Sequence, residues 1–132
     1  MDPITTAILA AIAAGAVSGV FKVGEQAVPD LYTKLKELIR KKFGPNSKVV
    51  KAAVELEANP KSTARKEVVK EEIAASKADQ DKELLEAAQA LIKSVKALPG
   101  GTQIIQTAIG DQNVQIAGDG NIVNVNTPNS KR

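Results

Sequence analysis

Residues 79–98 read DQDKELLEAAQALIKSVKAL, and they form the clearest helical pattern in the chain. Apolar side chains recur at the spacing of one helical face, while charged side chains occupy the opposite face. Asp79 stands at the beginning, where an aspartate can cap the first turn of a helix. The segment therefore predicts an amphipathic helix that must bury one face against other helices. That face consists of Leu84, Leu85, Ala88, Leu91, Ile92, Val95 and Leu98.

Weaker helical patterns precede this segment, separated by proline and glycine. The first helix should begin with Asp2 as its N-cap and Pro3 at its first position, and Pro29 should end it. Ser47 is the expected cap of the third helix. The predicted helices before Asp79 cover residues 4–28, 30–43, 47–56 and 62–76. Residues 1–98 therefore predict an all-α protein, a small bundle of four or five helices.

The composition excludes most catalytic chemistry. The chain has no cysteine and no histidine, so disulfides, thiolate chemistry and the commonest general base and metal ligand are missing. The sequence also contains no phosphate loop, metal-spacing motif or nucleophile–base pair. We therefore expect a protein that is not an enzyme and that binds no cofactor or metal. The net charge is only +3, and the sequence shows no nucleic-acid-binding motif that would support its cations. Nucleic acid is therefore not an expected partner.

The N-terminal helix carries no charge from Pro3 to Phe21. As one helix this run would be roughly 28 Å long, close to the ~30 Å hydrocarbon thickness of a bilayer. A secretory signal peptide is disfavoured, because no positive charge precedes the apolar run. Two interpretations remain open: a core helix of the bundle, and a membrane-inserting helix over residues 4–28. The candidate membrane residues are Ile4, Ile8, Leu9, Ile12, Gly15, Val17, Gly19 and Val20.

Small and basic residues near this helix bear on the membrane interpretation. Gly15 and Gly19 form a G-x-x-x-G pair, a spacing that lets helices approach closely in lipid but also inside a soluble bundle. A basic cluster follows, which is either a solvated helix face or a contact for anionic lipids. The candidate lipid contacts are Lys22, Arg40, Lys41 and Lys42.

The composition changes after Leu98. Residues 99–101 read PGG and predict a linker, and residues 102–130 carry only the charges of Asp111 and Asp119. The letters IGDQNV at 109–114 are echoed by AGDGNI at 117–122, so turn residues alternate with short β-branched runs.

Such short runs cannot form a stable sheet alone, but they can stack against copies of themselves. Residues 102–132 therefore predict a cross-β assembly motif with its core at about 105–126, disordered in the monomer. The alternatives are a disordered tail and an edge hairpin of the helical domain. The candidate motif residues are Ile109, Gly110, Asn113, Val114, Gln115, Ile116, Gly118, Gly120, Asn121, Ile122, Asn124 and Val125.

Residues 113–121 resemble the bacterial amyloid signalling motifs, relatives in kind of the RIP homotypic interaction motif. The core of the latter is a hydrophobic-Gln-hydrophobic-Gly tetrad, which Val114, Gln115, Ile116 and Gly118 match although Ala117 intervenes. The opening of the chain, Met1-Asp2-Pro3-Ile4 running into an Ala/Gly-rich helix, resembles the bacterial Bell domains, which are analogous to fungal HeLo domains.

These resemblances imply a pore-forming cell-death effector, which composition and spacing alone would not. Its expected partners are membrane lipids, further copies of itself, and an NLR-like sensor whose matching motif templates the C-terminal segment. Its expected location is the cytoplasm before activation and the cell membrane afterwards. The alternatives are a soluble helical adaptor that assembles without attacking membranes, and a constitutively anchored membrane protein with a disordered tail.

Overall fold

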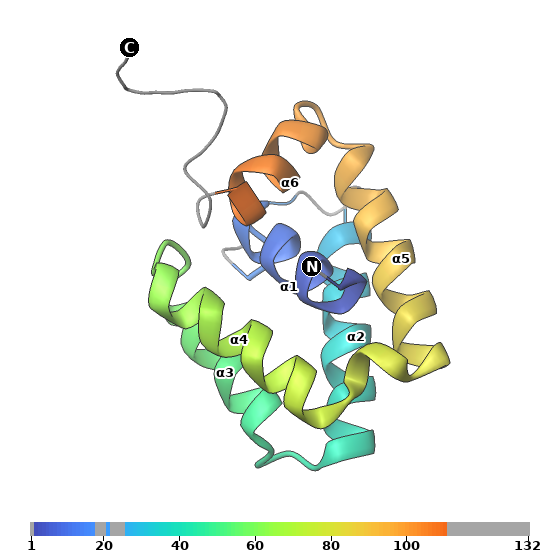
Figure 1. Ribbon diagram of the computed structural model, residues 1–132. Coiled ribbons are helices and arrows are strands. Elements are labelled where there is room, and N and C mark those ends of the chain that lie inside the picture. The colour runs from blue at the N-terminus through green and yellow to red at the C-terminus, as the bar shows by residue number, and fades with distance from the viewer. Residues whose placement is uncertain (1, 18–20, 22–25, 111–132) are drawn as a thin grey trace.

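The computed structural model describes residues 2–17, 21 and 26–110 (Figure 1). Within these ranges the chain is all-helical and contains no strand, which confirms the all-α class. The residues from 111 onward, which carry most of the predicted cross-β motif, lie outside the described ranges. The elements in chain order are α1 (Pro3–Ala13), α2 (Ala27–Phe43), α3 (Lys48–Ala58), α4 (Thr63–Ser76), the short 3-10 helix η2 (Ala78–Gln80), α5 (Lys82–Lys96) and α6 (Gly101–Gly110).

Helix α1 lies in the middle of the bundle, and the other helices surround it (Figure 1). Each of them contacts α1, with the most extensive contacts made by α5 and α6. Ile4, Thr5 and every residue from Ala7 to Ile12 are buried. A helix that is apolar on all sides must be covered on all sides in water, and the bundle supplies that cover.

The surrounding helices bury one stripe each. Helices α3 and α4 form an antiparallel hairpin, α2 packs on α5, and η2 connects α4 to α5 (Figure 1). The stripe expected from the sequence of α5 is confirmed for Leu84, Ala88, Leu91 and Val95, which are fully buried. Its other members, Leu85, Ile92 and Leu98, pack partly buried against the core. The buried side chains of α2 and α5 are Val28, Tyr32, Leu35, Ile39, Leu84, Ala88, Leu91 and Val95.

Side-chain caps begin four of the helices. Asp2 accepts hydrogen bonds from the Thr5 amide at 2.8 Å and the Thr5 hydroxyl at 2.6 Å, as expected for the start of α1. The predicted Ser47 cap is also confirmed, since its hydroxyl accepts from the Val50 amide at 3.3 Å. The predicted Asp79 cap is wrong, because Asp79 lies inside η2. Asp81 caps α5 instead and accepts from the Leu84 amide at 3.0 Å.

The first helix is much shorter than residues 4–28. It ends at Ala13, because Gly15 adopts a left-handed conformation with φ of 96° and closes the helix. The amide of Gly15 donates to the Ile12 carbonyl at 3.0 Å and the amide of Ala16 to the Ala11 carbonyl at 3.0 Å, a pairing that satisfies the last helical carbonyls. At about 1.5 Å per residue, α1 is roughly 16 Å long.

Pro29 also acts differently from the expectation, since it lies inside the first turn of α2 rather than ending the preceding helix. A proline is tolerated there because the first amides of a helix have no intrahelical acceptor. In the part of the chain that the structure describes, no helix is long and apolar enough to cross a membrane.

Helix α6 corrects the expected boundary after Leu98. Gly101–Gly110 is helical, whereas the sequence predicted a linker over 99–101 and a β-forming segment after it. Gly100 adopts φ of 70°, and Gly101 is packed so tightly that a Cβ there would lie 1.9 Å from the Val95 carbonyl oxygen. The glycines therefore make a tight turn between α5 and α6. The helical unit continues to Gly110, because packing on α1 and α5 overrides the local β preference.

Candidate functional site

The candidate site is helix α1 together with the elements that cover it. The sequence-predicted membrane residues Ile4, Ile8, Leu9 and Ile12 are all buried, so they act as core residues in this conformation. The interior of the bundle is closed around them. Three fully buried alanines of α1, Ala7, Ala10 and Ala11, leave room for the neighbouring helices to come near.

The end of the predicted membrane segment has a different environment. Gly15 lies in the turn after α1, so it presents no G-x-x-x-G face on a helix in this conformation. Val17 follows with 44% of its surface exposed. Gly19, Val20 and Lys22 lie outside the described residues.

Helix α6 packs extensively on α1 but buries few side chains of its own. Ile105 and Ala108 are its buried side chains, and Ile104 and Ile109 pack partly buried against the core. An open groove of about 360 Å³ separates Ala13 at the end of α1 from the α5–α6 turn and α6. The lining residues are Ala13, Pro99, Gly100, Gln103, Ile104 and Thr107. Few buried contacts are typical of an element that opens at low free-energy cost.

Two of the predicted motif residues belong to α6. Ile109 and Gly110 are the last residues of α6 rather than parts of a strand. The other candidate motif residues, from Asn113 to Val125, lie outside the described residues.

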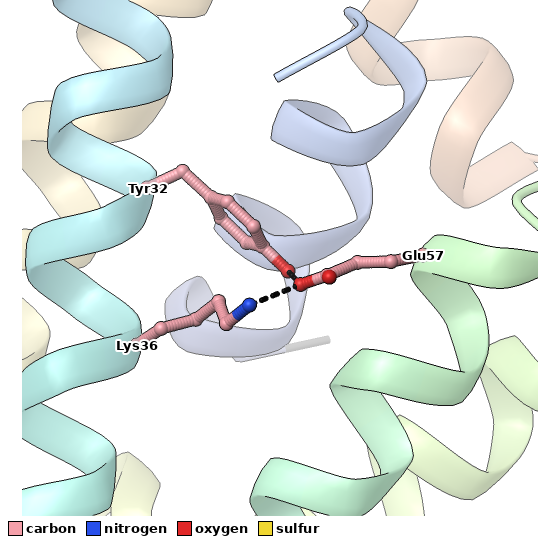
Figure 2. Close-up of polar contacts among 3 residues, drawn as sticks. All are labelled: Tyr32, Lys36 and Glu57. Atoms are coloured by element: carbon pink, nitrogen blue, oxygen red, sulfur yellow. Dashed lines mark hydrogen bonds and ion pairs between the residues drawn. The ribbon is translucent and has the colours of Figure 1, made fainter. Parts of the chain in front are cut away.

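A polar cluster joins α2 to α3 beside the core (Figure 2). The Tyr32 hydroxyl and the Lys36 ammonium both donate to Oε2 of Glu57, each at 2.6 Å. The Lys36 nitrogen also lies 5.4 Å from the centre of the Tyr32 ring, within the range of a cation–π contact. Burial, together with the Glu57 carboxylate, raises the pKa of Tyr32 far above its usual range. The spacing of Tyr32 and Lys36 on one helix was visible in the sequence, but no local pattern pointed to Glu57.

The predicted lipid contacts separate into two groups. Lys42 forms ion pairs with Asp81 at 3.1 Å and Glu83 at 3.0 Å, and so joins the end of α2 to the start of α5. Hydrogen bonds to these carboxylates raise the pKa of Lys42. The pKa of Asp81 is lowered, first by the Leu84 amide and further by Lys42. Arg40 and Lys41 remain exposed on the last turn of α2.

The described residues were also compared with the side-chain groupings that bind metal ions. Among the residues placed by the structure, no group of three or more His, Cys, Asp or Glu side chains gathers in a way that could hold a metal ion.

The comparisons identify one related family. The family model described as the Het-E N-terminal domain matches residues 1–132. Comparison with curated proteins and with solved structures gave no match.

Proposed function

Because this chain belongs to the Het-E N-terminal domain family, a HeLo-like family of cell-death domains, we propose that it is an effector that kills cells by disrupting membranes, with α1 as the membrane-active element. The observation that carries the proposal is the placement of α1, an uncharged helix apolar on all sides, inside the bundle. Such a helix is stable in water only while it is covered. Once uncovered, it gains free energy by entering another apolar environment, at about 25 cal/mol per Å² of buried apolar surface.

The length of α1 limits how it acts. At roughly 16 Å it covers only about half of the ~30 Å hydrocarbon layer. The uncharged run continues in the sequence to Phe21. In lipid, every backbone group must be hydrogen-bonded internally, which favours continuation of the helix past Gly15. The proposed active form therefore uses the whole uncharged run.

Helix α6 supplies the proposed trigger. Residues 105–110 belong both to α6 and to the predicted cross-β core at about 105–126. A residue cannot belong to a helix and to a stacked strand at the same time. Assembly of the C-terminal segment, templated by other copies or by an NLR-like sensor with a matching motif, would therefore unfold α6 and remove one cover of α1.

Assembly also strengthens the binding of α1 to a membrane. An Ala-rich helix has only a modest affinity for a bilayer. Copies clustered on one fibril bind as a multivalent unit, whose avidity exceeds the affinity of each helix by a factor of about 10² to 10⁴. We therefore propose that the protein is cytoplasmic while α1 is covered and that it binds the cell membrane after assembly.

A cross-link between α1 and α6 tests the proposal directly. Ala13 and Thr107 line the same groove, and the chain has no native cysteine, so Ala13→Cys and Thr107→Cys introduce a unique thiol pair. The full-length double variant is joined with a cleavable bifunctional maleimide, seeded with fibrils of residues 99–132, and mixed with dye-loaded vesicles. We expect no leakage while the linker is intact and full leakage after cleavage. The single-cysteine variants treated with the same reagent are the controls.

The result also separates this function from that of a soluble adaptor. An adaptor would form fibrils and release no dye with the linker intact or cleaved. Expression in cells gives a second readout, because an adaptor should be harmless whether or not residues 1–21 are present. Leakage that is equal with the linker intact and cleaved would contradict the role of α6.

A further inference from the structure

The corner between α2 and α3 carries an excess of positive charge. No Asp or Glu occurs between Glu37 and Glu55, although this stretch contains several cations. The two helices are held close by a short connection, in which the Gly44 amide donates to the Arg40 carbonyl at 2.8 Å. The Lys51 amide donates to the Ser47 carbonyl at 3.0 Å and starts α3 directly after the turn. The cations of the stretch are Arg40, Lys41, Lys42, Lys48 and Lys51.

Lys42 does not contribute to this excess, because it pairs with both Asp81 and Glu83, and these three groups together carry one net negative charge. The other cations, Arg40, Lys41, Lys48 and Lys51, are exposed and take part in none of the ion pairs formed among the described residues. We call these four residues the basic corner.

Neighbouring acidic groups leave the basic corner largely uncompensated. Lys48 and Lys51 lie on the solvent face of α3, since the opposite face buries Val49, Ala53 and Leu56. Glu55, the next acidic residue on that face, has its own partner in Arg65 at 3.7 Å. On α2 the nearest exposed carboxylate is that of Glu37, one turn before Arg40 and Lys41. A net positive surface therefore faces solvent at this corner.

We infer that the basic corner docks on the headgroups of anionic lipids and recruits the folded protein before α1 is uncovered, an inference that rests on the proposed function. Lipid headgroups require only charge, and each basic residue near such a surface strengthens binding about fivefold. Single-stranded nucleic acid is bound with aromatic stacking as well. Tyr32 is buried and Phe43 packs against the core, so the corner offers no exposed ring.

The sequence alone indicated a different set of lipid contacts. It grouped Lys42 with Arg40 and Lys41 by adjacency, and it did not include Lys48 or Lys51. In the fold, Lys42 is unavailable as a lipid contact because it pairs with Asp81 and Glu83. The short α2–α3 connection places Lys48 and Lys51 near the end of α2. The inferred surface is therefore a property of two helices.

Binding of the unassembled, full-length protein to vesicles tests this inference. The vesicles consist of phosphatidylcholine with or without phosphatidylserine, and the bound fraction is measured by flotation. Lys48→Gln/Lys51→Gln should weaken binding to the anionic vesicles about 25-fold, and adding Arg40→Gln/Lys41→Gln should abolish it. The matched control is Lys93→Gln/Lys96→Gln, which removes the same charge from exposed positions of α5. That control should lose less than threefold, and raising the salt concentration should abolish the difference between variants.

Three results would overturn the inference. An equal loss in the control would show that only net charge matters. Undiminished binding by the fourfold variant would show that the corner is not the contact. Binding of duplex DNA that is tighter than vesicle binding, and lost in the same variants, would assign the corner to nucleic acid.

The test is independent of the proposed membrane attack. Failure of the corner variants to change vesicle binding leaves the leakage of the α1–α6 cross-linked protein as a separate question. Conversely, a protein that binds vesicles through the corner and never releases dye would retain the docking surface and lose the proposed function.

Discussion

The hydroxyl of Tyr32 on α2 donates a 2.6 Å hydrogen bond to the carboxylate of Glu57 on α3. Only 1% of the Tyr32 surface is exposed, so the hydroxyl depends on this carboxylate for the partner that water would otherwise provide. The contact joins the two helices on one side of α1, and Lys36 donates to the same oxygen. The cluster is therefore a polar anchor between α2 and α3 in a bundle whose core is aliphatic.

Replacing Tyr32 with phenylalanine should measure the strength of this anchor. Tyr32→Phe removes a hydrogen bond to a charged acceptor, and we expect a loss of about 1.5–3 kcal/mol in the free energy of unfolding by urea. The matched control is Lys36→Gln, which removes a partly exposed ion pair and should cost less than about 1 kcal/mol. A larger loss for Lys36→Gln than for Tyr32→Phe would contradict the proposed role of the hydroxyl.

The same hydroxyl predicts how stability depends on pH. Burial raises the pKa of Tyr32 well above the value of about 10 in an unfolded chain. The stabilisation is therefore complete below pH ~10 and is lost as the pH rises further, because only the unfolded state then ionises.

Ultraviolet absorbance of tyrosinate measures this directly, since the chain has a single tyrosine. The absorbance should appear together with the loss of the helical circular dichroism signal, and Tyr32→Phe should reduce the alkaline loss of stability. Ionisation of the tyrosine near pH 10 in a protein that is still fully helical would refute the prediction.

Gly15 should be required for the end of α1. Its φ of 96° is strained for any residue with a side chain, so Gly15→Ala should lower the free energy of unfolding by about 1–2 kcal/mol. The substitution also favours a helix that continues past Ala13, so we expect stronger partition of a peptide of residues 1–21 into vesicles. Gly110→Ala is the control, because a Cβ there meets no atom within 4 Å. Equal stability of Gly15→Ala and the wild type would argue against the glycine stop.

Gly101 should control how firmly α6 is held. A Cβ at this position would lie 1.9 Å from the backbone oxygen of Val95, so Gly101→Ala must displace α6 from the end of α5. We expect a loss of about 2–3 kcal/mol and faster hydrogen exchange in residues 102–110. If α6 restrains assembly, the lag before fibril formation should also shorten. Faster exchange with an unchanged lag would separate the stability of α6 from assembly.

The sequence anticipated much of the candidate site. The uncharged run beginning at Pro3 identified α1 as a helix that must be covered in water. The family match confirms the HeLo-like part of the resemblance. The Bell-domain and amyloid-motif assignments remain predictions. Gly15 was visible as well, but it was interpreted as part of a helix-packing pair rather than as the residue that ends the helix.

By itself, the sequence determined the features that arise within one or two turns of a helix. Asp2 and Ser47 cap their helices, α2 ends at Phe43, and the stripe of α5 is buried, because hydrogen bonds and side-chain periodicity between near neighbours are sufficient for them. Only the tertiary structure decided the rest. Residues 101–110 become helical because burial of their side chains against distant parts of the chain outweighs their local β propensity. Lys42 binds Asp81 because the fold brings together two opposite charges that are far apart in the sequence.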